Sequence, residues 1–229
     1  MLVVIPARGG SKRIPNKALR PLAGSSLLAR AIQRARAAGY DPVVATASEA
    51  IAAAARALDV VVLARQAWTA TDDAPDYTWA QMLPKAYPSE QVFAIVRVTS
   101  PFLAVSHADR MLESLANESQ SSVRCVTPAQ QHPGKMWIFG EGHMGVPVYQ
   151  GTWAWMESWK TPYRSTPTQV LPRAYLQTAG LEVTTAMTLG HSLAGDRVGL
   201  YVVTGPEALD INVPEDWTRA EEIAQTWTT

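Results

Sequence analysis

Short runs of β-branched residues alternate with longer, alanine-rich segments along much of this 229-residue chain. The run LVVI at 2–5 is followed by a segment at 25–39 that begins with serines and ends at Gly39, as amphipathic helices commonly do. The alternation then repeats as far as residue 127. This pattern predicts a mostly parallel β-sheet covered by helices, and the near-continuous apolar strands indicate a sheet buried on both faces. The expected fold class is therefore α/β.

The expected elements follow from this periodicity. Strands are predicted at 2–5, 42–47, 60–64, 92–98, 122–127 and 197–203, and helices at 25–39, 49–59, 76–87, 106–118 and 214–227. Pro84 is expected to shorten or kink the helix at 76–87, because proline removes a backbone donor and crowds the preceding turn.

The alternation of strand-like and helix-like segments stops between residues 128 and 172. This excursion is rich in Gly, Pro and Trp, shows no clear helical cycle, and holds four of the eight tryptophans. Aromatic residues in an irregular segment indicate an interface or a lid over a site, although local packing of a loop layer is an equal alternative. We expect one domain over 1–229, with 128–172 inserted within it.

Composition excludes several classes of protein. With 47% hydrophobic and 17% charged residues, the chain can bury a sizeable core, which argues against disorder. The single cysteine, Cys125, excludes an internal disulfide framework and is compatible with a reducing cytoplasm. The opening apolar run is too short for a signal peptide, and no stretch approaches the roughly 20 residues needed to span a bilayer. We expect a cytoplasmic protein that does not bind membranes.

The chain begins with an unusual concentration of positive charge. Its first 40 residues carry 8 basic side chains and no acidic one, although the whole sequence balances 20 against 20. Five of the eight lie in the loop that follows the first strand, together with Gly9 and Gly10. A glycine-rich turn at the carboxyl end of a strand lets backbone N–H groups approach phosphate oxygens, so the loop predicts a phosphate site. A solvated basic turn is the alternative.

Six stretches of the sequence resemble motifs of one known protein family. They are IPARGGSKRIPNKALRPLAG (5–24), RQAWTATDDAPD (65–76), VRVTSPF (96–102), HPGKMW (132–137), LPRAYLQTAG (171–180) and ALDINVPEDW (208–217). In this order they closely resemble the motifs of the acylneuraminate cytidylyltransferase family, which makes CMP-activated sugar acids from CTP. The resemblance implies a Rossmann-like nucleotidyltransferase fold over 1–229, with 128–172 as a dimerisation or lid subdomain, and a homodimer.

The resemblance also implies roles for matching residues. Arg8 would hold the nucleotide phosphates, Lys12 would face the β- and γ-phosphates, and Lys17 would stabilise charge that develops at the α-phosphate. These three are the expected catalytic residues. The other residues expected to bind the nucleotide are Gly9, Gly10, Ser11, Arg65, Ala74 and Asp76. The residues expected to bind the acceptor are Arg97, Thr99, Ser100, Lys135 and Gln177. Asp210 is the expected ligand of Mg²⁺.

The sequence departs from the family motifs at several of these positions. Ala18 stands where the family has asparagine, and Arg97 stands where it has glutamine. Thr178 and Ala179 replace an asparagine–glycine pair, and Asn212 replaces a second metal-binding aspartate. The phosphate-handling residues match better than the acceptor-handling ones, so the resemblance indicates the reaction class more strongly than the substrate.

The leading interpretation is a cytidylyltransferase that uses CTP and an anionic acceptor, such as a sugar acid or a phosphonate. Arg97 and Lys135 would bind the acid group, although Arg97 could instead pair with Asp76 and serve the fold. Asp210 could likewise cap the final helix rather than bind a metal. The alternatives are a degenerate relative that binds without turnover and an enzyme that uses another nucleotide. A nucleic-acid binder is disfavoured, because no aromatic residues interleave with the basic run and the net charge is zero.

Overall fold

The computed structural model describes residues 1–71, 73–140, 144–148 and 165–227. The chain forms two compact units: Met1–Val126 together with Gln177–Thr229, and Thr127–Leu176. In the described residues, no helix combines the length and the apolar character that a membrane crossing requires.

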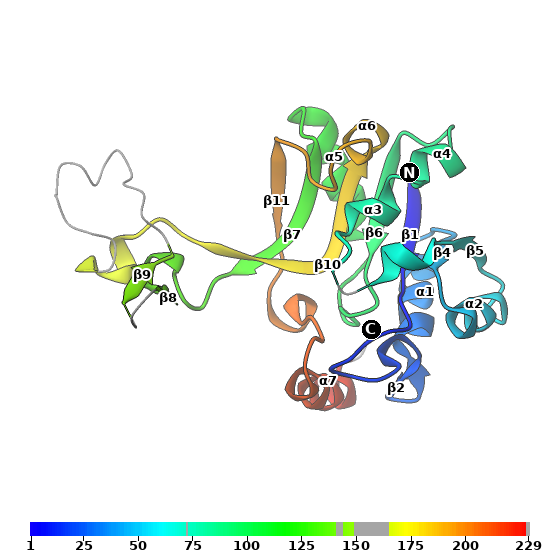
Figure 1. The fold of residues 1–229 in the computed structure, drawn as a ribbon, viewed down its shortest axis with the longest axis horizontal. Coiled ribbons are helices and arrows are strands. Elements are labelled where there is room, and N and C mark those ends of the chain that lie inside the picture. The colour runs from blue at the N-terminus through cyan, green and yellow to red at the C-terminus, as the bar shows by residue number, and fades with distance from the viewer. Residues whose placement is uncertain (72, 141–143, 149–164, 228–229) are drawn as a thin grey trace. The chain divides into compact units, whose positions relative to one another are not determined.

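The larger unit is built on a seven-stranded sheet (Figure 1). The strand order is β11 (Val198–Val202), β7 (Ser122–Pro128), β10 (Tyr175–Thr185), β6 (Val92–Val96), β1 (Leu2–Pro6), β4 (Val43–Thr46) and β5 (Val61–Ala64). The pairs β6–β1, β1–β4, β4–β5 and β11–β7 are parallel, whereas β10 pairs antiparallel with β6. The predicted α/β fold with a mostly parallel sheet is confirmed.

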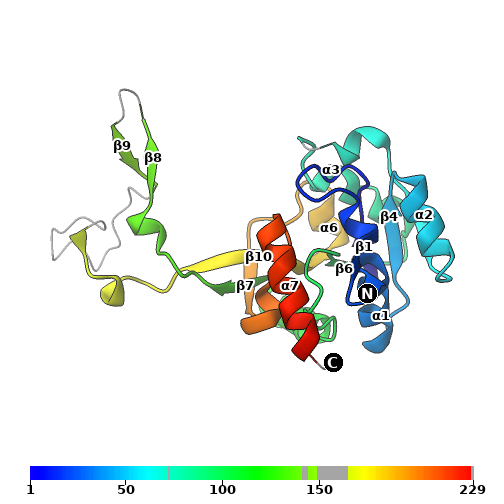
Figure 2. The same cartoon turned by 90° about the horizontal axis from the view of Figure 1, so that it is seen from below.

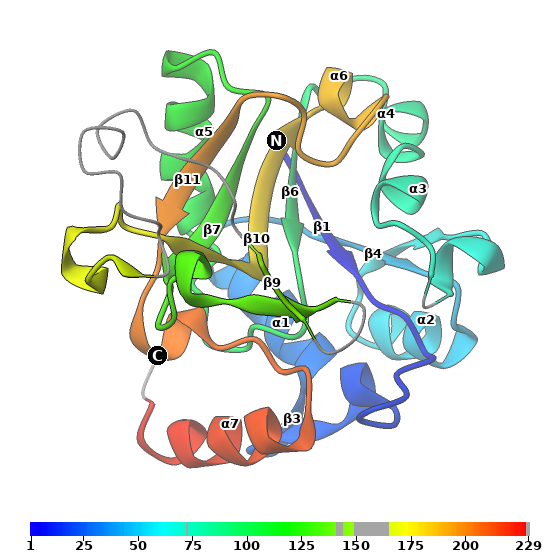
Figure 3. The same ribbon diagram turned by 60° about the vertical axis from the view of Figure 1, so that its left-hand side comes forward.

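Helices cover the sheet on both faces (Figure 3). The larger core lies under α1 (Leu27–Ala37), α2 (Glu49–Arg56), α5 (His107–Asn117) and α7 (Pro214–Thr226). The smaller core lies under three short helices, α3 (Tyr77–Ala80), α4 (Leu83–Ala86) and α6 (Ala186–Leu189). Alternate residues of β6 supply the two cores, with Ala94 and Val96 in the larger one and Phe93 and Ile95 in the smaller one.

The opening basic segment runs from β1 to α1 without a regular strand of the main sheet. It contains a 3₁₀ turn at Lys17–Leu19 and a small hairpin of β2 (Pro21–Leu22) and β3 (Ser25–Ser26). Ser26 caps α1 by accepting a hydrogen bond from Ala29 N at 3.1 Å. The helix expected at 25–39 is therefore shorter, because its first two residues pair in the hairpin.

Two local predictions needed correction. The helix expected at 76–87 is two helices, α3 and α4, and Pro84 lies in the first turn of α4, where a missing N–H costs nothing. The strand β10 was not expected at all. Its sequence mixes polar residues with Gly180, and its place between β6 and β7 is set by pairing with distant strands rather than by local composition.

The smaller unit contains a two-stranded hairpin, seen in Figure 2, of β8 (Trp137–Phe139) and β9 (Gly145–Pro147). 3₁₀ turns occupy Pro133–Lys135 and Thr168–Val170. Trp137 is in the hairpin, whereas the other three tryptophans of the predicted excursion, Trp153, Trp155 and Trp159, lie outside the described residues. A lid or interface role for 128–172 stays a prediction.

Candidate active site

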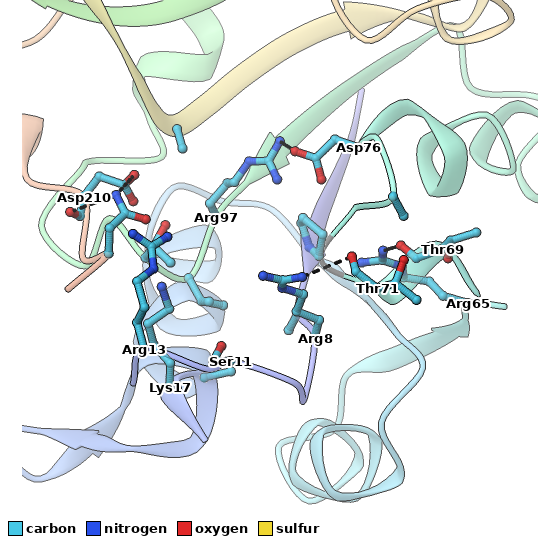
Figure 4. Close-up of a pocket in the computed structure, with 18 residues that line it drawn as sticks. Arg8, Ser11, Arg13, Lys17, Arg65, Thr69, Thr71, Asp76, Arg97 and Asp210 are labelled. Carbon is cyan, nitrogen blue, oxygen red and sulfur yellow. Dashed lines mark hydrogen bonds and ion pairs between the residues drawn. The ribbon is translucent and has the colours of Figure 1, made fainter. Parts of the chain in front are cut away.

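A cavity of about 380 Å³ opens at the carboxyl ends of the parallel strands of the larger unit (Figure 4). Its wall includes Ala7 and Arg8 after β1, Arg65 after β5, and Arg97 after β6. Ligands of open α/β sheets bind at this edge, because loops from several strands meet there. The cavity is therefore the candidate active site.

The basic loop supplies one side of the cavity. Figure 4 shows Arg13 and Lys17 on the side nearest Asp210, with Arg8 further along the wall. Lys17 Nζ donates a hydrogen bond to Ile211 O at 2.7 Å, and Arg8 Nη1 donates one to Thr71 O at 3.1 Å. Burial lowers the pKa of Lys17, Asp210 opposes that shift, and Arg13 and Arg8 add to it. The loop thus gathers three cations around a polar cavity.

Contacts with the last helix hold this loop in place. The Arg20 guanidinium lies 4.2 Å from the centre of the Trp217 ring, within the range of a cation–π interaction. Trp217 is buried on α7, and its Nε1 donates a hydrogen bond to Glu221 Oε1 at 2.9 Å. The contact between Arg20 and Trp217 and the hydrogen bond from Lys17 Nζ to Ile211 O therefore join the basic loop to the C-terminal segment of the chain.

Arg65 shapes the opposite side of the cavity. Its guanidinium donates a hydrogen bond to Thr69 O and lies 5.0 Å from the centre of the Trp79 ring. Burial lowers the pKa of Arg65 to about 10, although Asp76 opposes that shift. This arrangement fixes the 3₁₀ turn at Ala67–Ala70 beside the cavity.

Arg97 and Asp76 form an ion pair at the rim. Arg97 Nη2 lies 2.8 Å from Asp76 Oδ2, and Trp79 Nε1 donates to Asp76 Oδ1 at 3.3 Å. Burial alone would lower the pKa of Arg97, but the carboxylates of Asp76 and Glu182 outweigh it and the pKa is raised. The ion pair between Arg97 and Asp76 is thus present and both side chains line the cavity, while the acceptor role of Arg97 stays a prediction.

Asp210 lines the cavity, and its two carboxylate oxygens differ in their hydrogen bonds. Oδ2 accepts a hydrogen bond from Asn212 Nδ2 at 2.8 Å, whereas Oδ1 is buried and has no hydrogen-bond partner in the described part of the chain. The alternative in which Asp210 caps α7 is wrong. Asp216 does so, because its Oδ2 accepts hydrogen bonds from Asn212 N at 2.8 Å and Val213 N at 3.0 Å.

Comparison with known proteins identifies the family. A model of the cytidylyltransferase family matches residues 2–133. The chain belongs to this family. The resemblance recognised in the sequence is therefore confirmed.

The curated relatives of this chain match it over part of their length. N-acylneuraminate cytidylyltransferase of Streptococcus agalactiae is 28% identical over 137 residues, which are 58% of this chain and 33% of that protein. A 3-deoxy-manno-octulosonate cytidylyltransferase of an Anaeromyxobacter species is 36% identical over 131 residues, which are 56% of this chain and 50% of that protein. The match thus spans between a third and a half of these relatives.

Solved structures share the fold over nearly the whole chain. A CMP:2-keto-3-deoxy-manno-octonic acid synthetase complexed with CTP has a TM-score of 0.69 at 15% identity and covers 99% of both chains. A 4-diphosphocytidyl-2C-methyl-D-erythritol synthase from Anaerococcus prevotii has a TM-score of 0.65 at 9% identity and covers 98% of both. At these identities the likeness shows the fold alone.

The cavity of this family member brings together most of the residues expected from the sequence. The expected nucleotide-binding residues in its wall are Arg8, Ser11, Lys17, Arg65, Ala74 and Asp76, joined by Arg97, Thr99 and Asp210. Three residues of the basic loop, Gly9, Gly10 and Lys12, are exposed outside this wall. A Cβ on Gly9 would lie 3.0 Å from Ser48 Oγ, so this glycine permits the loop to pass close to the start of α2.

Three expected acceptor residues do not line this cavity. Ser100 is buried, and Gln177 lines a second cavity that shares wall residues with the first. Lys135 belongs to the smaller unit, where its Nζ donates a hydrogen bond to Thr166 O at 2.5 Å. Its predicted pairing with Arg97 on the acceptor stays a prediction.

Sequence reasoning missed several side chains around the two cavities. Arg13 lines the first cavity, and Arg124 and Glu182 line the second. Arg13 was visible as part of the basic loop. The signal for Arg124 and Glu182 was a single charged residue within an otherwise apolar or neutral strand, because burying a charge requires a partner.

Proposed function

We propose that this chain transfers CMP from CTP to an anionic acceptor and releases pyrophosphate. The observation that carries the proposal is that Arg8, Arg13 and Lys17 line one cavity whose wall also includes the Asp210 carboxylate. Membership of the cytidylyltransferase family supports the same reaction.

The proposed reaction needs positioning and charge neutralisation rather than a protein nucleophile. An oxygen of the acceptor attacks the α-phosphorus of CTP, the bond from the α-phosphorus to the α–β bridging oxygen breaks, and pyrophosphate leaves with the electron pair. Lys17 would stabilise negative charge at the α-phosphate, and its position as a half-buried cation held by Ile211 O supports this role. Arg8 and Arg13 would neutralise the departing phosphates.

Asp210 fits the role of a magnesium ligand. Mg²⁺ prefers oxygen ligands, and the buried Oδ1 of Asp210 is a carboxylate oxygen without a hydrogen-bond partner in the described residues. In that same part of the chain, no group of three or more His, Cys, Asp or Glu side chains is placed to bind a metal. A single protein carboxylate suits an ion that takes its remaining ligands from phosphates and water. Bound there, the ion would supply charge neutralisation of the triphosphate.

The wall formed by Arg65, Thr69 and Thr71 is the proposed base side of the site. The Thr69 and Thr71 carbonyls accept hydrogen bonds from Arg65 and Arg8, so this wall is rigidly held by two arginines. We propose that it selects cytosine, in line with the motif resemblance at 65–76. Ala18, which stands where the family has an asparagine, is buried and lines the same cavity without offering a hydrogen bond.

The acceptor is proposed to be an acid. Arg97 follows β6 at the edge of the nucleotide cavity, where its guanidinium can bind a carboxylate or phosphonate with two parallel hydrogen bonds. The names of the relatives refer to sugar acids, which belong to this chemical class.

A homodimer is the proposed assembly, with contacts that include 137–163. Part of this range, 141–143 and 149–163, lies outside the described residues. In the described part, Phe139 is 87% exposed and Met144 is 70% exposed on a two-stranded hairpin, which is marginally stable alone. Light scattering at micromolar concentration is expected to give twice the chain mass of 24.9 kDa. A monomer mass would contradict the dimer.

A pyrophosphate-release screen tests the proposed function. CTP and Mg²⁺ are incubated with sugar acids, phosphonates and neutral sugars, and release is expected only with the acids. Turnover of neutral sugars alone would refute the anionic acceptor. CTP binding without release under any acceptor would favour a relative that binds nucleotide without turnover.

A further inference from the structure

Three neighbouring strands place one charged side chain each on the same face of the sheet. Arg97 follows β6, Glu182 lies in β10 and Arg124 lies in β7, and these strands are adjacent in the order β7, β10, β6. Their sequence neighbours Val96, Leu181 and Cys125 belong to the larger core on the opposite face. The three charges therefore meet where hydrophobic residues would ordinarily continue the smaller core.

Glu182 connects the two arginines. Its Oε1 lies 3.7 Å from Arg97 Nη2, and its Oε2 lies 3.3 Å from Arg124 Nη2. Arg124 Nη1 also donates a hydrogen bond to Gln177 Oε1 at 3.0 Å. A single carboxylate thus contacts both guanidinium groups, together with Asp76 on Arg97 and Gln177 on Arg124.

The cluster borders a second cavity of about 360 Å³. This cavity shares Asp76, Arg97 and Ala179 with the nucleotide cavity, so the two adjoin. Arg124, Gln177 and Ser192 supply further polar groups to its wall. A molecule in the second cavity would therefore reach the nucleotide past Arg97.

Stability alone does not account for these buried charges. The side chain of Glu182 is 2% exposed and those of the two arginines are 16% exposed. Burial raises the pKa of Glu182, and Arg97 and Arg124 oppose that rise. Removing such charges from water costs free energy that their attraction often does not recover, and apolar residues of similar size are commonly as stable. Such a cluster beside a ligand cavity points to recognition.

We propose that the second cavity is the acceptor subsite, that Arg124 is a specificity-determining residue, and that Glu182 is the positioning residue that limits the acceptor to one negative charge. The inference rests on the proposed cytidylyl transfer. It assigns the second cation to Arg124 of the same unit, in a role that the sequence interpretation gave to Lys135.

The charge limit follows from the composition of the cluster. Arg97 and Arg124 carry two positive charges, and Glu182 and Asp76 carry two negative ones. Asp76 is the exposed member, with 51% of its side chain accessible, and it borders both cavities. A carboxylate that takes the place of Asp76 on Arg97 leaves this balance unchanged, whereas a doubly charged phosphate or phosphonate adds an uncompensated charge.

Binding measurements on a non-reacting complex test the proposal. The protein is saturated with α,β-methylene-CTP and Mg²⁺ and titrated calorimetrically with 3-deoxy-manno-octulosonate, a monocarboxylate, and with glucose 1-phosphate and hydroxymethylphosphonate, which are dianions at pH 8. The wild type is expected to bind the carboxylate at least tenfold more tightly than either dianion.

Variants separate the roles of the two residues. Arg124→Gln is expected to weaken binding of the carboxylate about tenfold or more, since a charged hydrogen bond is lost. It should leave binding of the CTP analogue within twofold of wild type. Glu182→Gln makes the net charge of the cluster more positive by one and should shift the binding preference at least tenfold toward the dianions. Glu182→Asp keeps the charge and should keep the wild-type preference. Arg197→Gln is the matched control, because Arg197 is exposed and donates to Glu118 O outside both cavities.

The variant Gln177→Ala tests the acceptor subsite a second time. It removes an exposed partner of Arg124 without disturbing the buried carboxylate of Glu182, and it should weaken binding of the carboxylate ligand about threefold. Binding of the carboxylate within twofold of wild type in both Arg124→Gln and Gln177→Ala would overturn the subsite. An unchanged preference in Glu182→Gln, or CTP-analogue binding with no carboxylate bound, would also overturn the proposal. Failure to bind the analogue would instead refute the proposed function on which it rests.

Discussion

Replacing Lys17 by methionine removes one positive charge from the nucleotide cavity while keeping a side chain of similar length. The folded protein loses the hydrogen bond from Nζ to Ile211 O, which contributes about 1 kcal/mol. It also no longer buries an ammonium group, whose pKa burial lowers, so part of this loss is offset. The free energy of unfolding should therefore change by about 1 kcal/mol or less, which is a melting shift of roughly 2–4 °C for a chain of this size.

The effect on turnover should be much larger. A preorganised donor aimed at charge that develops in the transition state typically contributes a factor of about 10² to 10³ in kcat, or about 3–4 kcal/mol. Lys17 meets the structural condition for such a donor, because Ile211 O holds its ammonium group at the cavity wall beside Arg13. We expect Lys17→Met to lower kcat by at least about 100-fold.

Steady-state pyrophosphate release and thermal unfolding are measured on the same preparations. Lys85→Met is the control, because Lys85 is exposed on α4 and does not line the cavity. The control should retain wild-type turnover. If Lys17→Met keeps kcat within threefold of wild type while it remains folded, Lys17 does not stabilise the α-phosphate.

Three further predictions concern the metal, the base and the last helix. Asp210→Asn should abolish turnover at limiting magnesium with a nearly unchanged melting temperature, because the lost charge acts only on the bound complex; near-normal turnover would remove the metal assignment. In a thermal-shift panel of four nucleotides with magnesium, CTP should give the largest shift, and equal shifts would exclude base selectivity. Asp216→Ala should lower the free energy of unfolding by about 1–2 kcal/mol in denaturant titrations, because Asn212 N and Val213 N lose their acceptor; no change would mean that the cap is dispensable.

Local sequence signals predicted the helices and strands whose own composition favours the conformation that they adopt. The β-branched runs at β1, β4 and β6 mark buried parallel strands, because each run is apolar on both faces, whereas the equally apolar run of β5 lies at the sheet edge and is partly exposed. β10 escaped prediction because antiparallel pairing with β6 places it in the sheet despite Gly180 and its polar residues. Such a strand is defined by its distant partners, which local composition does not encode.

The candidate site was likewise predicted only in the part that local sequence encodes. The basic loop was recognisable because its charges lie close together in the sequence and follow one strand, and Arg8 and Lys17 do line the cavity. The cluster of Arg124 and Glu182 was not recognisable, since these residues are 58 positions apart and meet only when β7 and β10 lie side by side. Arg124 appeared in the sequence only as an isolated charge in a predicted strand, and Glu182 lay where no strand was predicted.

Phosphorus NMR of a reaction with CTP, Mg²⁺ and 3-deoxy-manno-octulosonate tests cytidylyl transfer most directly. The three resonances of CTP should be replaced by pyrophosphate and one phosphodiester resonance, in equal molar amounts, because the α–β bond is the one that breaks. Lys17→Met run in parallel should leave CTP intact over the same time. Formation of CDP with inorganic phosphate, or CTP that stays unchanged with every acid acceptor, would contradict transfer at the α-phosphate.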